Sequence, residues 1–262
     1  MDRTTWADPE VVGALQPTSI AIQVDVDQEA ELAKSLGILA MPTVIAFRDG
    51  VELDRVTGLQ RREELLAWLE GLSKGKTSLQ TLREEVAANP TDMRIRMDLA
   101  DKLLSSGLLP EATTEFIWLW VHILEHDESM VGVRHSYLLE DLKNLAERHA
   151  PARTELERLR DEAAPSAGSP IDNDRLKDWF SLNKALGERS RGLEWFDSAR
   201  PEPKGNARLA RLLEHELVPL LLDEDRWADI GRLYAKPMKT LAMLAEIKRH
   251  AGELPPEIRA GH

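Results

Sequence analysis

The sequence predicts a mixed α/β unit over residues 1–74 followed by a region that is helical throughout. Two observations predict the first part: β-branched residues gather in short runs, and an Asp-Gly turn joins two of these runs. A third observation predicts the second part, because strand signals stop after Ser78 and apolar residues recur at helical spacing from there on. Linker-like composition near residues 74 and 164 gives three expected domains, at 1–74, 77–164 and 171–262.

Three helices and three strands are expected in the α/β unit. The first helix begins at Asp8, whose side chain can cap it, with Pro9 at the first helical position. Residues 19–26 (SIAIQVDV) are rich in β-branched residues and follow a proline, so they read as a buried strand. The other expected elements are a helix over 29–36 ended by Gly37, strands over 43–47 and 51–57, and an amphipathic helix over 61–72.

The helical region carries paired amphipathic segments. Segments over 138–149 and 153–163 form one such pair, and segments over 209–222 and 227–234 form another. Tryptophans are frequent here for a chain with few aromatic residues, and they could line a ligand groove or anchor the core. We favour core anchors, because large aromatic side chains usually bury most of their surface.

Composition excludes several classes of function. The chain has 262 residues, a net charge of −12 and no cysteine. An acidic protein without a basic cluster repels phosphate backbones and anionic lipids, so neither nucleic acid nor membrane is an expected partner. Without a thiol, the chain cannot form a disulfide or carry out thiol–disulfide exchange. The N-terminus lacks the apolar core of a signal peptide and no apolar run is long enough to span a bilayer, so we expect a soluble, cytoplasmic protein.

Five linked motifs resemble the thioredoxin family. They are 24–28 (VDVDQ), 36–38 (LGI), 41–44 (MPTV), 48–50 (RDG) and 56–58 (VTG), and residues 4–12 resemble the segment that follows the active-site helix in its disulfide-reductase branch. The resemblance implies a partial thioredoxin-like fold with a cis peptide bond between Met41 and Pro42. It also implies a peptide-binding corner at Met41 and Pro42, with Gly58 lining the same groove. The simpler alternative is a loop that enters a strand.

The chain departs from the family at its most characteristic motif. The redox CxxC and the family's first strand, first helix and second strand would all precede Met1. Two interpretations stay open: a degenerate domain without redox chemistry, or a native start upstream of the recorded one, which the abrupt beginning favours. The family's second strand normally lies between the two that match 19–26 and 43–47. Those two must therefore pair directly, borrow a strand from elsewhere, or leave backbone groups unpaired.

Residues 89–126 resemble one tetratricopeptide repeat. Ala100 and Ala112 would let two antiparallel helices approach, Gly107 would make the turn, and Phe116 would fill the seam. A generic helical hairpin is the alternative. Stacked hairpins present a concave surface to peptides, so the leading hypothesis is a non-catalytic protein that binds a protein or peptide client. The alternative is a thiol–disulfide oxidoreductase whose CxxC lies upstream, which leaves the enzyme question open. The incomplete sheet would also allow a homo-oligomer.

One motif suggests a metal site. His122, Glu125 and His126 fit the HxxEH pattern of inverted zinc peptidases, in which two imidazoles at i and i+4 share one helix face. The segment coincides with the second helix of the repeat-like unit, and we favour a solvated helix face. No metal, cofactor or catalytic residue is therefore expected, and a metallopeptidase ranks third among the functions.

Overall fold

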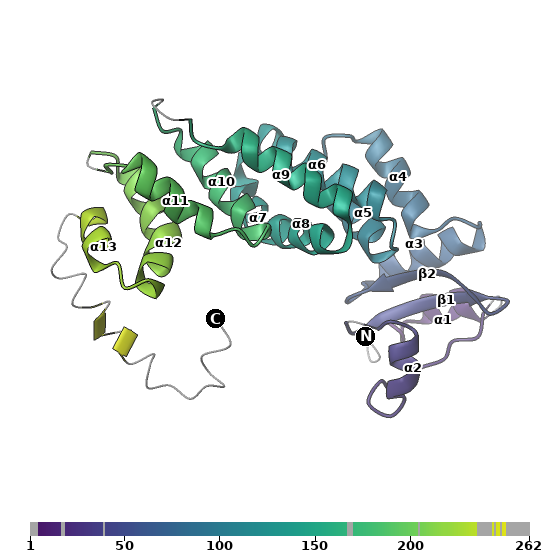
Figure 1. The fold of residues 1–262 in the computed structure, drawn as a ribbon. Helices are drawn as coiled ribbons and strands as arrows, with labels where there is room; N and C mark the ends of the chain where they lie inside the picture. Colours follow the sequence, from purple (N-terminus) through teal and green to yellow (C-terminus); the bar gives the residue numbers. More distant parts are fainter. Residues whose placement is uncertain are drawn as a thin grey trace. The chain divides into compact units, whose positions relative to one another are not determined.

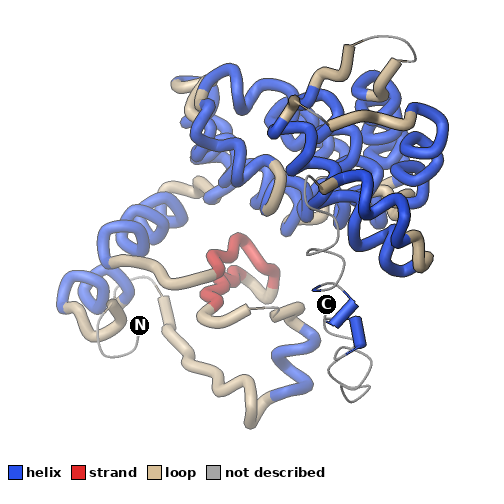
Figure 2. Tube along the Cα trace, turned by 90° about the vertical axis from the view of Figure 1, so that its left-hand side faces the viewer, coloured by secondary structure: helices blue, strands red, loops and turns tan. Residues whose placement is uncertain are grey.

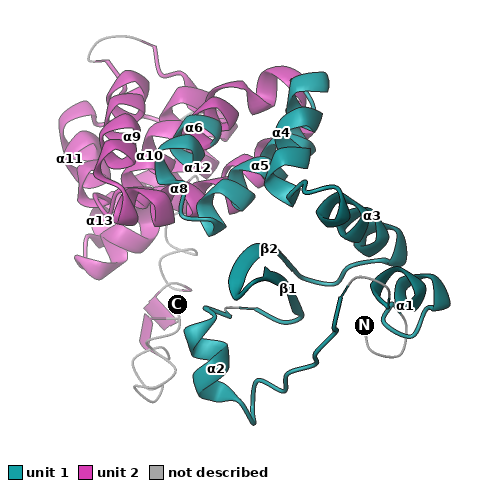
Figure 3. Cartoon of the chain, turned by 90° about the vertical axis from the view of Figure 1, so that its right-hand side faces the viewer, with its two compact units in different colours: residues 1–115 teal, residues 116–262 magenta. Residues whose placement is uncertain are grey.

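The computed structural model describes residues 5–16, 19–38, 40–166, 170–203 and 205–234, together with 243, 245, 246, 248 and 249 (Figure 1). Over these residues the chain has thirteen α-helices, one short 3-10 helix and a two-stranded sheet. It divides into two compact units, residues 1–115 and 116–262 (Figure 3). The three domains at 1–74, 77–164 and 171–262 stay predictions, and part of the expected 164–170 linker lies outside the described residues.

The sheet of the first unit is the hairpin that the Asp-Gly pair predicts. Strands β1 (Thr43–Arg48) and β2 (Val51–Thr57) pair antiparallel, with an irregularity in register after Ala46. Asp49 and Gly50 both have positive φ, at 53° and 78°, which matches the right-handed twist of the strands that they join.

Three helices accompany the hairpin. Helix α1 (Pro9–Leu15) is capped by the Asp8 carboxylate, which accepts a hydrogen bond from the Glu10 amide. Helices α2 (Ala30–Ser35) and α3 (Arg62–Ser73) also form close to their predicted positions. Helix α1 packs against α3, where Val11 and Leu65 are fully buried.

The prediction of a buried strand over 19–26 is wrong. These residues form no ladder, and the side chains of Ile20 and Ile22 are 89% and 81% exposed. Figure 2 shows the segment as loop between α1 and α2. The physical reason is the lack of a neighbour: within the described residues β1 pairs only with β2, and β-propensity without a partner strand or a packed face does not make a strand. Of the expected alternatives, direct pairing of 19–26 with 43–47 is therefore not observed, and a strand supplied by another copy stays a prediction.

The first unit continues as helices. Helices α4 (Ser78–Ala88) and α5 (Met93–Ser105) pack together, and Gly107, with φ of +73°, makes the turn into α6 (Leu109–His126). Ion pairs from Arg83 to Glu111 and from Arg96 to Glu115 join the start of α6 to α4 and α5. The expected linker near residue 74 directly follows α3, which ends at Ser73.

The second unit is helical over all its described residues. After α6 come a 3-10 turn, η1 (Glu128–Met130), and then α7 (Val131–Arg134), α8 (Tyr137–Arg148), α9 (Ala150–Ala163), α10 (Asn173–Ala185), α11 (Ser190–Ala199), α12 (Ala207–Asp223) and α13 (Trp227–Leu233). Helix α9 packs on both α8 and α10. The core formed by α10 to α13 buries Trp179, Phe180 and Phe196, and Trp120 of α6 is also buried, as the core-anchor prediction expects; Trp118 and Trp195 are only partly buried.

Candidate functional site

The three residues that resemblance assigned to a peptide-binding corner lie together. The Met41–Pro42 bond is cis and leads directly into β1, where Thr43 Oγ1 donates a hydrogen bond to the carbonyl of Ala40 at 2.7 Å. Gly58, directly after β2, donates its amide to the carbonyl of Pro42 at 2.8 Å. The φ of Gly58 is +90°, a conformation that residues with a side chain rarely adopt, so glycine is the residue suited to this position.

Met41 is the accessible member of this corner. Its side chain is 67% exposed, whereas Pro42 is half-buried. The described residues offer no hydrogen-bond partner to the backbone groups of Met41, and the strand pairing begins two residues later, at Thr43 opposite Thr57. An exposed thioether on backbone with unused donors and acceptors can hold an extended peptide by main-chain hydrogen bonds and apolar contact.

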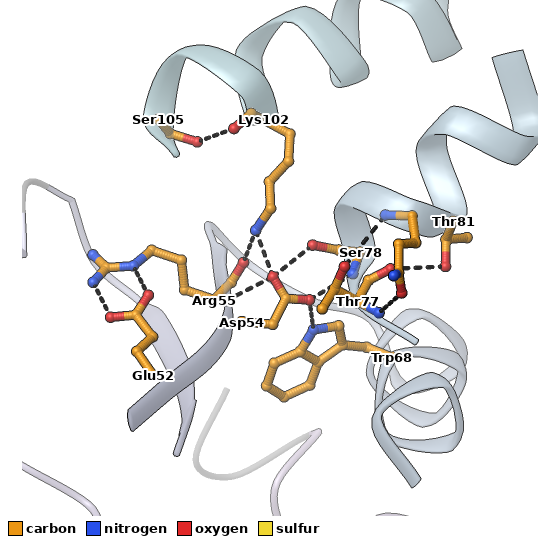
Figure 4. Close-up of polar contacts among 10 residues, drawn as sticks. Glu52, Asp54, Arg55, Trp68, Thr77, Ser78, Thr81, Lys102 and Ser105 are labelled. Carbon is orange, nitrogen blue, oxygen red and sulfur yellow. Dashed lines mark hydrogen bonds and ion pairs between the residues drawn. The ribbon is translucent and has the colours of Figure 1, made fainter. Parts of the chain in front are cut away.

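A second cluster, centred on Asp54 of β2, is buried and polar (Figure 4). The Asp54 carboxylate, only 3% exposed, accepts hydrogen bonds from Trp68 Nε1 at 2.9 Å and from Lys102 Nζ at 2.7 Å. It also accepts from the Ser78 amide at 2.6 Å and from the Ser78 hydroxyl at 2.8 Å. Lys102 additionally donates to the carbonyl of Arg55 at 2.6 Å. The cluster thus joins β2 to α3, α4 and α5.

These contacts determine the charge of Asp54. Burial alone would raise the pKa of its carboxyl, but the hydrogen bonds from Lys102, Ser78 and Trp68 outweigh burial and bring that pKa below its ordinary value. Asp54 is therefore an ionised, fully partnered anchor. Because donors from α3, α4 and α5 occupy both of its carboxylate oxygens, we assign it a structural role.

Sequence reasoning missed this cluster, although one signal for it was present. In a strand, residues two apart share a face, so Asp54 lies on the same face as Val56. A carboxylate at such a position needs a buried cation or several N–H donors. The partners are 14 to 48 residues away in sequence, and no local pattern identifies them.

The residues of the HxxEH motif lie on α6. His122 Nδ1 lies 2.8 Å from Glu125 Oε2, and the Trp118 ring contacts the imidazoles of both His122 and His126, with centroids 4.8 and 5.8 Å away. Across the part of the chain that the structure describes, no group of three or more His, Asp or Glu side chains is arranged to hold a metal ion. Nor is any of the described helices long and apolar enough to cross a membrane.

Comparisons with known proteins match the part of the chain that contains the Met41–Pro42 corner. The sequence model of the thioredoxin family matches residues 9–71. Thioredoxin from Staphylococcus saprophyticus is 29% identical over 75 residues, which cover 25% of this chain and 72% of that protein. Thioredoxin from Chlamydia caviae is 39% identical over 44 residues, 17% of this chain and 43% of that protein, and thioredoxin from Chlamydia muridarum is 32% identical over 57 residues, 22% and 56%.

No solved structure matches the chain. The matched segment contains α1, α2, the β1–β2 hairpin with its cis-proline corner, and nearly all of α3. The tetratricopeptide-like reading of 89–126 has no such match and stays a prediction. Residues 9–71 therefore form a thioredoxin-family domain within a longer and mostly helical chain.

Proposed function

We propose that this protein is a non-catalytic, cytoplasmic adaptor that binds an extended segment of a client protein at the Met41–Pro42 corner. The observation that carries the proposal is the exposed Met41, whose backbone has no partner among the described residues and which lies beside Pro42 and Gly58. The absence of cysteine from the sequence leaves this corner a binding surface without a nucleophile. Without a cysteine the domain cannot carry out redox chemistry, but it can still bind a client.

The helical hairpins fit the same proposal. Gly107 makes the turn between α5 and α6, as expected of a tetratricopeptide-like unit, and the helix pairs α4–α5 and α8–α9 are packed together. Such hairpins present a large surface to a partner, so we assign them the choice of client. This assignment rests on fold-level analogy.

A substitution at Met41 tests the proposal. We expect Met41→Asp to weaken binding of an extended apolar peptide about tenfold, because a charge would replace the apolar contact and would have to be desolvated. Val51→Asp is the matched control: Val51 is 64% exposed at the hairpin turn, so the same charge there should leave affinity unchanged. Fluorescence anisotropy with a labelled peptide measures both variants. Equal affinities for the two variants would remove the corner as the site.

Thiol–disulfide exchange is the second candidate function. It is supported by the relatives, which are named thioredoxins. Because these 262 residues contain no cysteine, the activity would require a CxxC preceding residue 1. The intact mass of the protein from its source cells, together with insulin reduction by that material, tests this alternative. A mass of 29.5 kDa without reductase activity would eliminate it.

Residues 19–26, which form no strand in this copy, support one further part of the proposal, which is self-association. Ile20 and Ile22 are exposed on this segment, whose backbone could pair with a second copy. We expect sedimentation velocity to show a concentration-dependent dimer that the double substitution Ile20→Lys, Ile22→Lys converts to monomer. A wild-type protein that stays monomeric at high concentration would overturn this part of the proposal.

A further inference from the structure

A groove of about 580 Å³ lies within the second unit. Its walls come from α6, α7, α8, α10 and α12, so it is separate from the thioredoxin-family domain. The apolar part of the lining consists of Val121, Leu124, Val131, Leu139 and Leu212, while basic side chains from α7, α10 and α12 supply most of its charge.

The floor of the groove is fixed by a buried polar network. The Arg134 guanidinium lies 3.9 Å from the centroid of the Trp120 ring, and its Nε donates to the Trp120 carbonyl at 2.9 Å. Arg134 also donates to both carboxylate oxygens of Asp178. His135 Nδ1 and Ser181 Oγ lie 3.0 Å apart. These groups satisfy one another, so the floor is rigid and the charge of Arg134 is neutralised.

The rim of the groove carries cations without a counterion. Lys177, Lys184 and Arg211 line the groove, and the described residues provide no ion pair or hydrogen bond to any of their side chains. The other rim charges are already paired: Arg208 with Asp174, and His215 with Glu216. In a chain of net charge −12, this groove therefore holds three cationic side chains without an ion-pair partner beside apolar side chains.

We propose that this groove binds an acidic peptide segment of a partner protein. Lys177 and Lys184 are seven residues apart on α10, which is about 10 Å along the helix axis. Three residues of a polyproline II chain, which has three residues per turn, span about the same length and return to the same face. A peptide in this conformation with acidic residues three positions apart could thus place one carboxylate at each lysine, while apolar side chains between them contact Leu124 and Leu212.

The groove suits a peptide better than a nucleic acid. A phosphate backbone needs a continuous series of cations, whereas here the unpaired cations are three and the remaining surface of the protein is acidic. The apolar lining also has no counterpart on a phosphate backbone. This groove is independent of the Met41–Pro42 corner, so either site can fail its test without affecting the other.

Peptide binding to the full chain tests the proposal. The probe is a short fluorescein-labelled peptide with glutamates three positions apart and leucines between them; the comparison ligands are the same peptide with glutamines and a single-stranded DNA oligomer. We expect the acidic peptide to bind about tenfold or more tightly than the neutral one, and its affinity to fall as salt is raised. Equal binding of the acidic and neutral peptides, or tighter binding of the DNA, would overturn the proposal.

Two sets of variants locate the binding site. The triple variant Lys177→Gln, Lys184→Gln, Arg211→Gln should lose about tenfold or more in affinity. The matched control is Lys34→Gln, Arg148→Gln, Arg189→Gln, which removes three exposed cations outside the groove and should change affinity less than about twofold. Equal losses in the two triples would show non-specific attraction and overturn the site.

A charge reversal at Lys184 should strengthen the binding of a different peptide, and an unfolded variant could not show such a gain. Lys184→Glu should weaken the acidic peptide and strengthen a peptide in which one glutamate is replaced by lysine. Failure of this exchange of preference, in a variant whose circular dichroism matches the wild type, would mean that Lys184 does not contact the ligand.

Discussion

Asp54 and Lys102 form a buried ion pair whose remaining hydrogen-bonding capacity is also used. Their side chains are 3% and 13% exposed, and both make further hydrogen bonds, to Trp68 and Ser78 or to the Arg55 carbonyl. Desolvating such a pair is costly, so its presence alone does not stabilise the fold much. Removing one partner is a different matter, because the other is then left buried and charged.

We therefore expect Lys102→Met to reduce the free energy of unfolding of the first unit by about 3 kcal/mol. The double variant with Asp54→Asn should recover part of this loss, since no uncompensated charge then remains. Urea unfolding followed by circular dichroism measures the change, and hydrogen exchange should place it in β2, α4 and α5. Lys143→Met is the control, because the Lys143–Glu140 pair is exposed and contributes little. Losses of similar size for both lysines would contradict the role given to Lys102.

His135 links stability to pH in the second unit. Burial, together with the charges of Lys177 and Arg134, lowers the pKa of its imidazole to about 3. Its side chain is 11% exposed. Below about pH 6.5 the unfolded chain therefore binds a proton at this residue that the folded chain does not, and stability falls with decreasing pH until the folded pKa is reached.

Between pH 6.5 and 4.5 this residue should cost about 2 kcal/mol of unfolding free energy. The variant His135→Gln should lack that part of the pH dependence, which thermal unfolding across this range measures. Asp54 behaves in the opposite way in a lower window: its depressed pKa means that its stabilisation is complete above about pH 3.8 and is lost only below it. Parallel pH profiles for wild type and His135→Gln would show that His135 is protonated in the folded state.

At the scale of elements, local signals predicted the start of α1, which depends on its own cap, and the hairpin, which depends on its own turn. Asp8 caps α1 and Gly50 turns the hairpin through contacts within a few residues. The segment 19–26 has equally good β-propensity, but a strand is completed by a distant partner that sequence periodicity does not reveal. The Met41–Pro42 corner was found through a five-motif resemblance, whereas the Asp54 cluster and the basic groove depend on contacts between distant elements.

In helix α11, Gly192 lies so close to neighbouring side chains that helix propensity alone would predict the wrong effect of replacing it. A Cβ atom built on Gly192 would lie 2.8 Å from Cε1 of Phe180 and 3.4 Å from Leu217 Cδ2, so α11 approaches its neighbours where only glycine fits. Propensity favours replacing a glycine inside a helix, but Phe180 is only 5% exposed and packs in the core of α10 to α13.

We expect Gly192→Val to lower the free energy of unfolding by about 1–3 kcal/mol through overpacking. Gly132→Ala provides the comparison within the same unit, since a Cβ there would meet no atom within 4 Å and should be neutral or slightly stabilising. Chemical denaturation of the two variants decides between packing and propensity. A Gly192→Val protein as stable as wild type would mean that α11 shifts away from Phe180 at no cost.

For the whole molecule, net charge and the exposed apolar segment act against each other. The charge of −12 at pH 7 keeps copies apart, while Ile20, at 89% exposure, and Ile22, at 81%, favour association. Because the isoelectric point is about 5.1, the net charge approaches zero at mildly acidic pH and the repulsion between copies disappears. The balance between these two terms should therefore change sharply as the pH approaches 5.

We expect the wild-type protein to scatter light strongly near pH 5 and to remain clear at pH 7.5, because only the repulsive term changes over this range. The variant Ile20→Lys, Ile22→Lys should stay clear at its own isoelectric point, since the apolar segment that drives association is gone. A control with lysines at the exposed Ser35 and Thr91 changes the charge equally but keeps the segment, and it should scatter at its shifted isoelectric point. If both double variants scatter alike when compared at zero net charge, the segment has no part in association, and charge alone governs the solubility of this chain.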